Sequence, residues 1–378
     1  MANQFPAILV TGARQVGKTS ILRRVFPGVS YVTLDYPGHA EAAQTAADEF
    51  LDRFPPPVII DEIQYAPSLL RHIKVRIDSD RRPGMYLLTG SQAFPLMQGV
   101  SESLAGRCGV LNLHTLSRSE ILGAQSPVGE PDLVWLGGYP ELYVGADPDL
   151  WFPSYVATYL ERDIRNVLRV VDLRDFNRFI RACALRNAQT LNYSDLARDT
   201  GIAPNTARKW LSLLEASGVV ALVEPFFGNR TKRMIKSPRL YFLDTGLAAF
   251  LAGFRSSKAL FESSYVGAFW EAFIFGQVVR WFAAKGRPSP IYSWRTVNGK
   301  EVDLVLEMGG GKIVGIECKW TQHPGRSDEA GLMAFVDSQK VEAETFVVCR
   351  ASAEFRLPGG AWVTDLGGLL TRLGDFGG

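Results

Sequence analysis

The chain has 378 residues, which is room for about two or three domains of ordinary size. Its 47% hydrophobic and 21% charged residues are typical of a globular protein, and a formal net charge of +2 neither indicates nor excludes a nucleic-acid partner. Four widely separated cysteines and four scattered histidines provide no disulfide framework and no zinc motif, and the cysteines favour a reducing, cytoplasmic compartment.

The N-terminal residues lack the basic region and the long apolar core of a signal peptide. The most apolar long segment runs from Val266 to Ala284 and carries Glu271 and Arg280. Both charges would be costly in the middle of a bilayer. We therefore predict a buried or amphipathic helix at this segment and expect no membrane partner.

Residues 12–19, GARQVGKT, follow a strand-like apolar run and match the phosphate-binding pattern G-x-x-x-x-G-K-[ST]. Lys18 is predicted to reach the β- and γ-phosphates of ATP, and the Thr19 hydroxyl to hold Mg²⁺. A helix predicted directly after the loop would add its N-terminus to the phosphate site. The alternative is a plain glycine-rich turn. The predicted nucleotide-binding residues are Gly12, Ala13, Arg14, Gln15, Val16, Gly17, Lys18, Thr19 and Ser20.

A second apolar strand, residues 58–63, ends in two carboxylates. Asp61 is predicted to lie beside the Mg²⁺ ion, and Glu62 to polarise the attacking water as a general base. The alternative is an acidic pair that caps a turn. A third strand leads to Thr89 and Ser91, polar residues that would face the γ-phosphate.

Two more strand-like runs, residues 31–35 and 109–113, would complete a parallel sheet. Strands that alternate with helical patterns indicate an α/β layered fold, whose ligand site lies at the carboxyl ends of the strands. The first predicted domain is therefore an α/β phosphate-loop NTPase domain that covers residues 1–145.

A series of motifs carries a family resemblance: TGARQVGKTS, LDYP, VIIDEIQ, YLLTGSQ, SLAGR, LSRSEI and GGYPE. Their order resembles a large family of prokaryotic AAA-type ATPases, whose members join this core to a C-terminal domain of unknown function with a winged helix and a nuclease-like fold. The resemblance spans nearly the whole chain. It implies ATP and Mg²⁺ as cofactors, with Lys18, Thr19, Asp61 and Glu62 as the residues that serve them.

The resemblance also implies a sensor at Thr89 or Ser91, and Arg107 as an arginine finger. Such a finger reaches a neighbouring subunit and stabilises charge on the transferring phosphate, so a homo-oligomer such as a ring is expected. A surface salt bridge is the alternative for Arg107. Family members usually carry a helical segment ahead of the first strand, whereas here that strand begins near Ala7, which leaves the adenine contacts open.

Residues 146–253 are predicted to form a helical and winged-helix domain. Residues 155–172 and 176–186 place apolar residues at helical spacing with arginines on the other face, which is typical of a solvated surface. Next, residues 192–229 fit helix, Gly201 turn, helix and strand, a helix-turn-helix with a wing. Between residues 205 and 239, seven basic residues against two acidic ones give a local net charge of +5, which favours DNA contact. A protein-docking lid is the alternative.

Residues 254–378 are predicted to form an α/β domain similar to the restriction-endonuclease-like fold. Glu317 and Lys319 share one face of a strand, because side chains alternate along it. Asp303 and Glu317 would hold a divalent cation by oxygen ligation while Lys319 orients a water. With Glu271 from the preceding helix, they resemble the D…E-x-K core of that fold. The alternative is a structural salt bridge.

We therefore predict a Mg²⁺-dependent ATPase that couples ATP binding and hydrolysis to a C-terminal effector acting on DNA. One alternative is a nucleotide-dependent assembly switch without nucleic-acid chemistry. Another is a metal-dependent DNA nuclease that ATP licenses.

Overall fold

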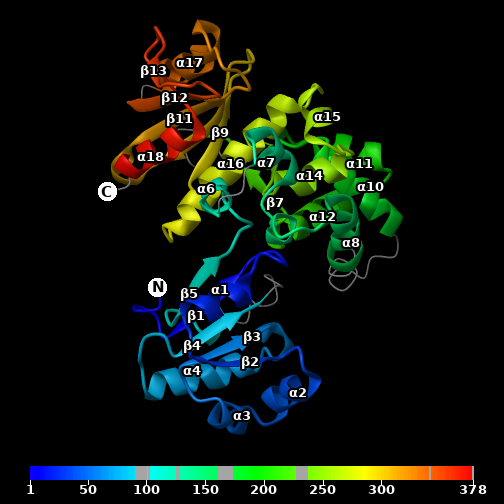
Figure 1. Cartoon of the computed structure of the whole chain (residues 1–378), viewed down its shortest axis with the longest axis vertical. Helices are drawn as coiled ribbons and strands as arrows, with labels where there is room; N and C mark the ends of the chain where they lie inside the picture. The colour runs from blue at the N-terminus through cyan, green and yellow to red at the C-terminus, as the bar shows by residue number, and fades with distance from the viewer. Residues whose placement is uncertain are drawn as a thin grey trace. The chain divides into compact units, whose positions relative to one another are not determined.

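The computed structural model describes residues 1–90, 100, 103–124, 128–160, 173–226, 237–339 and 342–376 (Figure 1). The chain divides into two compact units. The first comprises Met1–Leu116, Tyr139–Val144 and Ala216–Val219, and the second comprises Ser117–Gly138, Gly145–Glu215 and Val220–Gly378. Each unit is described by itself below.

A five-stranded, all-parallel sheet with the strand order β2-β3-β4-β1-β5 forms the centre of the first unit. The strands are β1 (Ala7–Thr11), β2 (Ser30–Thr33), β3 (Val58–Asp61), β4 (Tyr86–Thr89) and β5 (Cys108–Asn112). The α-helices are α1 (Lys18–Val25), α2 (Pro37–Thr45), α3 (Ala47–Arg53) and α4 (Leu69–Ser79). Parallel strands need such crossover connections. The predicted α/β fold with a parallel sheet is confirmed.

Both faces of the three central strands, β1, β3 and β4, are buried. Leu9 and Ile60 pack on one face with residues of α2, α3 and α4, whereas Ile8, Val10 and Leu87 pack on the other face with α1. Successive side chains of a strand point to opposite faces, so a sheet covered on both sides needs apolar residues at every position. This requirement explains why the three central strands, β1, β3 and β4, read as nearly continuous apolar runs in the sequence.

The second unit begins with a helical region. Its helices are α6 (Arg118–Gly123), α7 (Glu130–Leu136), α8 (Pro148–Tyr155) with a π-helical continuation (Val156–Leu160), α10 (Leu173–Ala184), α11 (Tyr193–Thr200), α12 (Pro204–Ala216), α14 (Thr245–Ala252) and α15 (Ser257–Phe261). Phe176 and Phe179 of α10 pack edge-to-face on Trp210 of α12, with ring centroids 5.5 and 5.4 Å apart. Asn192 caps α11, which ends at Gly201 in the left-handed conformation. The helix, turn and helix therefore lie at the predicted residues.

A small antiparallel sheet with the order β6-β8-β7 follows the helix pair. Its strands are β6 (Gln189–Thr190), β7 (Val220–Val223) and β8 (Arg239–Phe242). Four of the basic residues predicted between helix and wing lie outside the described residues: Arg230, Lys232, Arg233 and Lys236. Beyond β7 the backbone pairs with the C-terminal sheet, since the N–H of Ser293 donates to the carbonyl of Glu224 at 3.0 Å.

The C-terminal sheet is mixed and has the order β13-β14-β12-β11-β10-β9. Its strands are β9 (Ile291–Arg295), β10 (Glu301–Glu307), β11 (Ile313–Cys318), β12 (Ala343–Val348), β13 (Phe355–Arg356) and β14 (Trp362–Thr364). Three helices pack with it: α16 (Val266–Ala284), α17 (Ala330–Gln339) and α18 (Leu366–Phe376). Most residues of α16 are buried, as predicted. Within the described ranges, no helix has both the length and the apolar character that a membrane crossing needs.

Candidate functional site

The phosphate-binding pattern forms the loop between β1 and α1. Gly12, Gln15 and Gly17 have positive φ angles of 136°, 60° and 91°. A Cβ atom on Gly12 would lie 2.1 Å from the carbonyl oxygen of Leu113, so only glycine fits there. Gly17 is the N-cap of α1, so the loop leads directly into the N-terminus of the helix, where backbone N–H groups can face a phosphate.

Lys18 is buried at the start of α1, and its ammonium lies against the loop backbone. It donates to the carbonyl oxygens of Gly12 at 3.1 Å and Ala13 at 2.8 Å. The ammonium is therefore held inside the loop, where a phosphate group would meet it. The other predicted loop residues range from buried to exposed: Val16 is buried, Arg14 and Thr19 are half-buried, and Gln15 and Ser20 are exposed.

Asp61 is the last residue of β3, and its carboxylate connects this strand to the phosphate-binding loop. One of its carboxylate oxygens, Oδ1, accepts a hydrogen bond from the Thr19 hydroxyl at 2.6 Å and another from the Thr89 hydroxyl. The other oxygen, Oδ2, accepts from the Tyr31 hydroxyl at 3.0 Å. A hydroxyl and a carboxylate side by side are oxygen ligands of the kind that Mg²⁺ prefers. Thr19 and Asp61 therefore fit the predicted ion.

Glu62 has a left-handed backbone, with φ 56° and ψ 48°. This conformation is uncommon for a residue other than glycine, and such residues occur often at functional sites. The backbone N–H of Glu62 donates to the Thr89 hydroxyl at 3.1 Å, and its carboxylate accepts from the Gln64 side chain. Thr89 thus touches both acidic positions. Ser91, the other predicted sensor, lies outside the described residues.

Negative charge gathers at the carboxyl ends of β2 and β3. Burial raises the pKa of Asp35, and the nearby charges of Glu62 and Asp61 raise it further. Burial and the Asp61 carboxylate also raise the pKa of Tyr31 to about 12. Carboxylates that repel one another in this way are relieved by a bound cation. The charge distribution therefore agrees with the donor set of Thr19 and Asp61.

Arg107 lies just before β5 and is paired with α4. Its guanidinium binds the Asp78 carboxylate through two hydrogen bonds of 2.5 and 3.0 Å, and it donates to the carbonyl of Ala105 at 3.0 Å. The hydrogen bonds from Arg107 and Lys74 hold the pKa of Asp78 at about 2. Within the single chain, Arg107 thus makes the surface salt bridge that the sequence left open as an alternative.

The four residues predicted for a nuclease-like site gather within the second unit. Glu271 comes from α16, Asp303 from β10, and Glu317 and Lys319 from β11 and the residue just beyond it. The Lys319 ammonium donates to Glu317 Oε1 at 2.7 Å. The N–H of Cys318 donates to Asp303 Oδ2 at 2.8 Å. We call this group, with its partners described next, the acidic centre.

An arginine that was not predicted for this site lies in the acidic centre. Arg239 of β8 is 5% exposed, and its Nη1 atom donates to Glu271 Oε1 at 2.8 Å and to Asp303 Oδ1 at 3.3 Å. Its Nη2 atom donates to Glu301 at 3.0 Å. Tyr241, two residues along β8 and so on the same face, donates to Glu271 at 2.5 Å. The alternation of Arg239 and Tyr241 within an apolar strand was the available sequence signal.

Burial dominates the electrostatics of the acidic centre. It raises the pKa of Glu271 and of Glu317 to about 8, and the Asp303 carboxylate adds to both shifts. Burial alone would lower the pKa of Arg239, but Tyr241 and the surrounding carboxylates outweigh it and raise that pKa. The guanidinium therefore stays charged.

The arrangement does not fit a metal ion as it stands. Among the residues that the structure describes, no three or more His, Cys, Asp or Glu side chains are grouped to hold one. Asp303, one of the two predicted cation ligands, and Glu271, the helix carboxylate of the same predicted core, both bind the guanidinium of Arg239. We therefore assign no step to a metal at Asp303 and Glu317.

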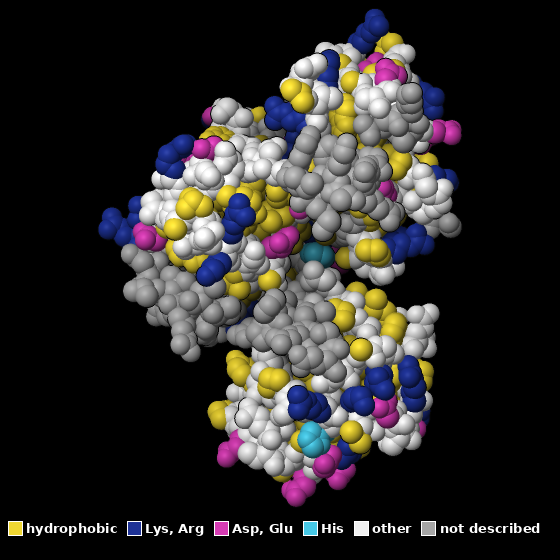
Figure 2. All heavy atoms as spheres, turned by 180° about the vertical axis from the view of Figure 1, so that it is seen from behind, with side chains coloured by type: hydrophobic (Ala, Val, Ile, Leu, Met, Phe, Trp, Pro, Cys, Tyr) yellow, Lys and Arg dark blue, Asp and Glu magenta, His cyan; other side chains and the backbone are white. Residues whose placement is uncertain are grey.

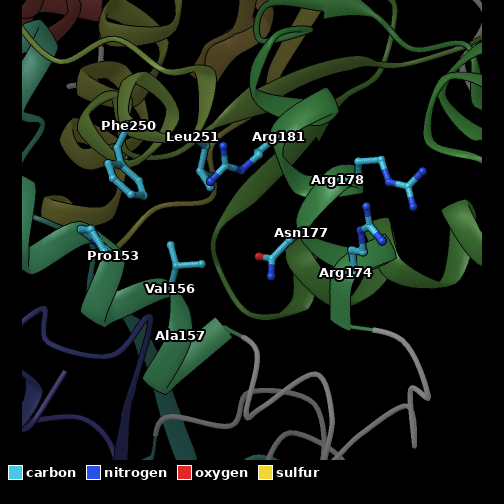
Figure 3. A pocket seen from close by; sticks show the side chains of 9 residues that line it. All are labelled: Pro153, Val156, Ala157, Arg174, Asn177, Arg178, Arg181, Phe250 and Leu251. Atoms are coloured by element: carbon cyan, nitrogen blue, oxygen red, sulfur yellow. The ribbon is translucent and has the colours of Figure 1, made fainter.

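A cavity of about 550 Å³ lies elsewhere in the second unit. Its lining comes from α8 and its continuation, α10 and α14 (Figure 3): Pro153, Val156, Ala157, Arg174, Asn177, Arg178, Arg181, Phe250 and Leu251. The arginines all belong to α10, at helical spacing. The sequence predicted a solvated arginine face here, and the structure places that face opposite an apolar wall. Among the described residues on the side of the molecule in Figure 2, basic side chains lie at several separate places.

The fold and the loop define a class of protein. An all-parallel sheet carries a glycine-dependent loop after β1, a helix that begins at Lys18, and an acidic residue at the end of β3 bonded to Thr19. Together they form a phosphate-loop nucleotide-binding domain. Comparison with protein families agrees, because the model of an AAA domain matches residues 4–122. Models of two domains of unknown function, DUF8612 and DUF4143, match residues 131–258 and 266–368.

The particular family follows from a relative. An uncharacterized protein of Mycobacterium tuberculosis is 32% identical over 330 residues, which cover 86% of this chain and 73% of the relative. The chain belongs to the family of AAA-type ATPases with a C-terminal domain of unknown function, which confirms the resemblance seen in the sequence.

Two solved structures show a distant likeness. A signal transduction ATPase with numerous domains from Pyrococcus horikoshii is 12% identical with a TM-score of 0.27, and the match covers 75% of this chain and 44% of that one. A half-complex of McrB AAA+ hexamers with bound McrC from Thermococcus gammatolerans is 12% identical with a TM-score of 0.23, over 68% of this chain and 74% of that one. Scores this low support no conclusion about function or assembly.

Proposed function

We propose that this chain is a Mg²⁺-dependent ATPase whose nucleotide cycle controls a C-terminal effector that acts on DNA. The observation that carries the proposal is the hydrogen bond between Thr19 and Asp61. It joins the phosphate loop to β3, so the residues proposed to bind the nucleotide and those proposed to bind Mg²⁺ are already close together. Glu62 follows directly on the same strand end.

Each residue of the loop site has a proposed role. Lys18 binds the β- and γ-phosphates of ATP, and Thr19 and Asp61 hold Mg²⁺, which neutralises charge on the phosphates when bound. Glu62 accepts a proton from the attacking water. Thr89 fixes Asp61 and Glu62 relative to one another through its two hydrogen bonds. Arg107 is the proposed finger supplied by a neighbouring copy in a homo-oligomer.

The proposed effector is the remainder of the chain. Residues 146–253 would act as a winged helix-turn-helix domain and residues 254–378 as a nuclease-like domain, in addition to the ATP-binding domain of residues 1–145. Support for DNA contact comes from α12, whose exposed surface carries Arg208 and Lys209. A second helix in this position is the one that can enter a major groove.

ATP turnover of the purified full-length chain tests the proposal. Lys18→Ala removes the ammonium inside the loop and should abolish nucleotide binding. Glu62→Gln keeps the shape of the site but loses the base, so binding should persist while turnover falls by about 10²–10⁴-fold. Glu49→Gln, the same change at an exposed site on α3, is the matched control and should leave turnover unchanged. Hydrolysis that survives both site variants contradicts the assignment.

A second candidate is an assembly switch without nucleic-acid chemistry. Arg239 favours it, because the guanidinium occupies the acidic centre where a nuclease would need a metal. This candidate predicts ATP-dependent oligomerisation, no affinity for DNA, and an effect of Asp303→Ala on stability alone. Measuring DNA binding with and without ATP separates it from the proposed function.

A further inference from the structure

The cavity of Figure 3 has two walls of different chemistry. One wall is α10, which contributes Arg174, Asn177, Arg178 and Arg181. The other wall is apolar and comes from α8, its π-helical continuation and α14. The described residues that line the cavity include three arginines and no acidic side chain. The space between the walls is therefore positive in potential and borders on apolar surface.

Packing within the second unit holds the apolar wall in place. Phe250 of α14 stacks on Phe152 of α8, with ring centroids 5.4 Å apart. Val156 and Leu251 are 8% and 3% exposed, so their backbones are fixed in the fold. The guanidinium of Arg255 lies 4.6 Å from the centroid of the Phe250 ring and adds a further cation near this wall. A ligand would therefore meet a wall that is already formed, which lowers the cost of binding.

The arginines of the other wall differ in what their guanidinium groups contact. Arg178 pairs with the carboxylate of Asp175, one turn earlier on α10. Within the described part of the chain, no carboxylate pairs with Arg181. In Figure 3 the Arg181 side chain extends from α10 toward Leu251, and Asn177 points toward the apolar wall. Arg181 therefore offers its donors to an anion inside the cavity.

The size and the lining of the cavity together define the class of ligand. Its volume of about 550 Å³ is that of a small-molecule site, and such sites combine apolar walls with a few polar groups that fix the orientation of the ligand. We propose that the cavity binds a small organic anion. Its phosphate, sulfonate or carboxylate group contacts Arg181 and Asn177, because a guanidinium presents a planar pair of donors to such oxygens. A flat apolar group of the same ligand lies against Val156 and Phe250. The site shares no residue with the phosphate-binding loop, so the proposal does not depend on the ATPase assignment.

Two matched probes test the charged and the apolar half of the site separately. Anilinonaphthalene sulfonate carries a sulfonate on a flat aromatic body, and N-phenylnaphthylamine is the same body without the sulfonate. Each is titrated into folded, full-length protein, and binding is followed by the fluorescence of the probe. We expect saturable binding of the sulfonate that weakens as salt is added, because exposed charges are screened. Binding of the uncharged probe should not change with salt.

Two substitutions locate the probes in the cavity. Arg181→Gln removes the cation and should weaken binding of the sulfonate by roughly 5- to 10-fold while leaving the uncharged probe unaffected. Its control is Arg198→Gln, the same change at an exposed position of α11. Ala157→Trp adds a large ring at an exposed position that lines the cavity and should weaken both probes. Its control is Ser154→Trp, at an exposed position of α8 outside the lining.

Four results would overturn the proposal. The first is the absence of saturable sulfonate binding to the folded parent protein. The second is unchanged sulfonate affinity in both Arg181→Gln and Ala157→Trp, which would place the probe elsewhere. The third is an equal loss in Arg181→Gln and its control, which would show general attraction to positive charge. The fourth is an equal loss of both probes in Arg181→Gln, which would show a packing role. All of the changed positions are exposed, so the variants should fold like the parent, and near-ultraviolet circular dichroism verifies this.

Discussion

Thr89 fixes Asp61 and Glu62, the two acidic residues of the loop site, relative to one another. Its hydroxyl donates to the Asp61 carboxylate and accepts the N–H of Glu62, and the residue is completely buried. A hydrogen bond to a charged group contributes about 1.5–3 kcal/mol. Thr89→Val has nearly the same shape, so we expect nucleotide binding to persist while turnover falls by about 10- to 100-fold.

The control for this prediction is Thr89→Ser, which keeps the hydroxyl and loses a methyl group. It should retain most of the turnover and lose some thermal stability. Measuring nucleotide affinity and turnover for both variants separates positioning from packing. Equal turnover in the valine and serine variants would show that the hydroxyl has no part in the reaction.

Residue-level predictions were possible where a local pattern contained the chemistry. The glycines around Lys18 and the carboxylates at the end of β3 can be recognised from neighbouring residues alone. Arg239 could not be recognised in this way, because its partners Glu271 and Asp303 are 32 and 64 positions away in the sequence. Its charge placed it among the basic residues of the predicted wing. Only tertiary packing shows that it is buried among carboxylates.

At the level of elements, α12 is the proposed DNA-contacting helix. Arg208 and Lys209 are exposed on it, whereas Trp210 faces the core. Replacing both cations by alanine should weaken DNA binding uniformly across sequences if they bind phosphates. The slope of log affinity against log salt should fall by about 1 for each phosphate that is no longer neutralised. Fluorescence anisotropy with a labelled duplex at several salt concentrations measures both quantities.

The matched control is a double alanine variant of Arg178 and Arg181 on α10. It removes the same charge from the same region, but these side chains line the cavity of Figure 3. We expect it to leave duplex affinity and the salt slope close to the parental values. Equal losses in the two variants would indicate general attraction to positive charge and would argue against α12 as a docking helix.

The positions of the helices in this region could largely be predicted from the sequence, because residues at the helix ends determine where each helix begins and ends. Asn192 caps α11 and Gly201 ends it in a left-handed conformation. The pairing of the strands could not be predicted from the sequence. β6 has only two residues and its partner β8 lies about 50 positions further along the chain, so no pattern within β6 specifies it. The backbone pairing of Glu224 with Ser293 likewise depends on the folded arrangement of both segments.

Assembly is the property of the whole molecule on which the role of Arg107 depends. In the single chain this arginine is bound to Asp78, so a role in a neighbouring active site requires that pair to break. We expect the molecular mass to rise with ATP and to be lower with ADP or without nucleotide. The pKa of Asp78, about 2 in the pair, should rise toward its ordinary value on assembly. Mass measurement and titration by NMR test the two steps separately.

Complementation then decides whether Arg107 acts across an interface. The Arg107→Ala variant keeps an intact loop and should lose about 10³–10⁵-fold in turnover, as expected for an arginine finger. The Lys18→Ala variant keeps the finger and lacks a working loop. Mixed together, each copy supplies what its neighbour lacks, so turnover should reappear in the mixture although each variant alone is inactive. If the two variants assemble together and remain inactive, Arg107 serves its own chain, and its pair with Asp78 is structural.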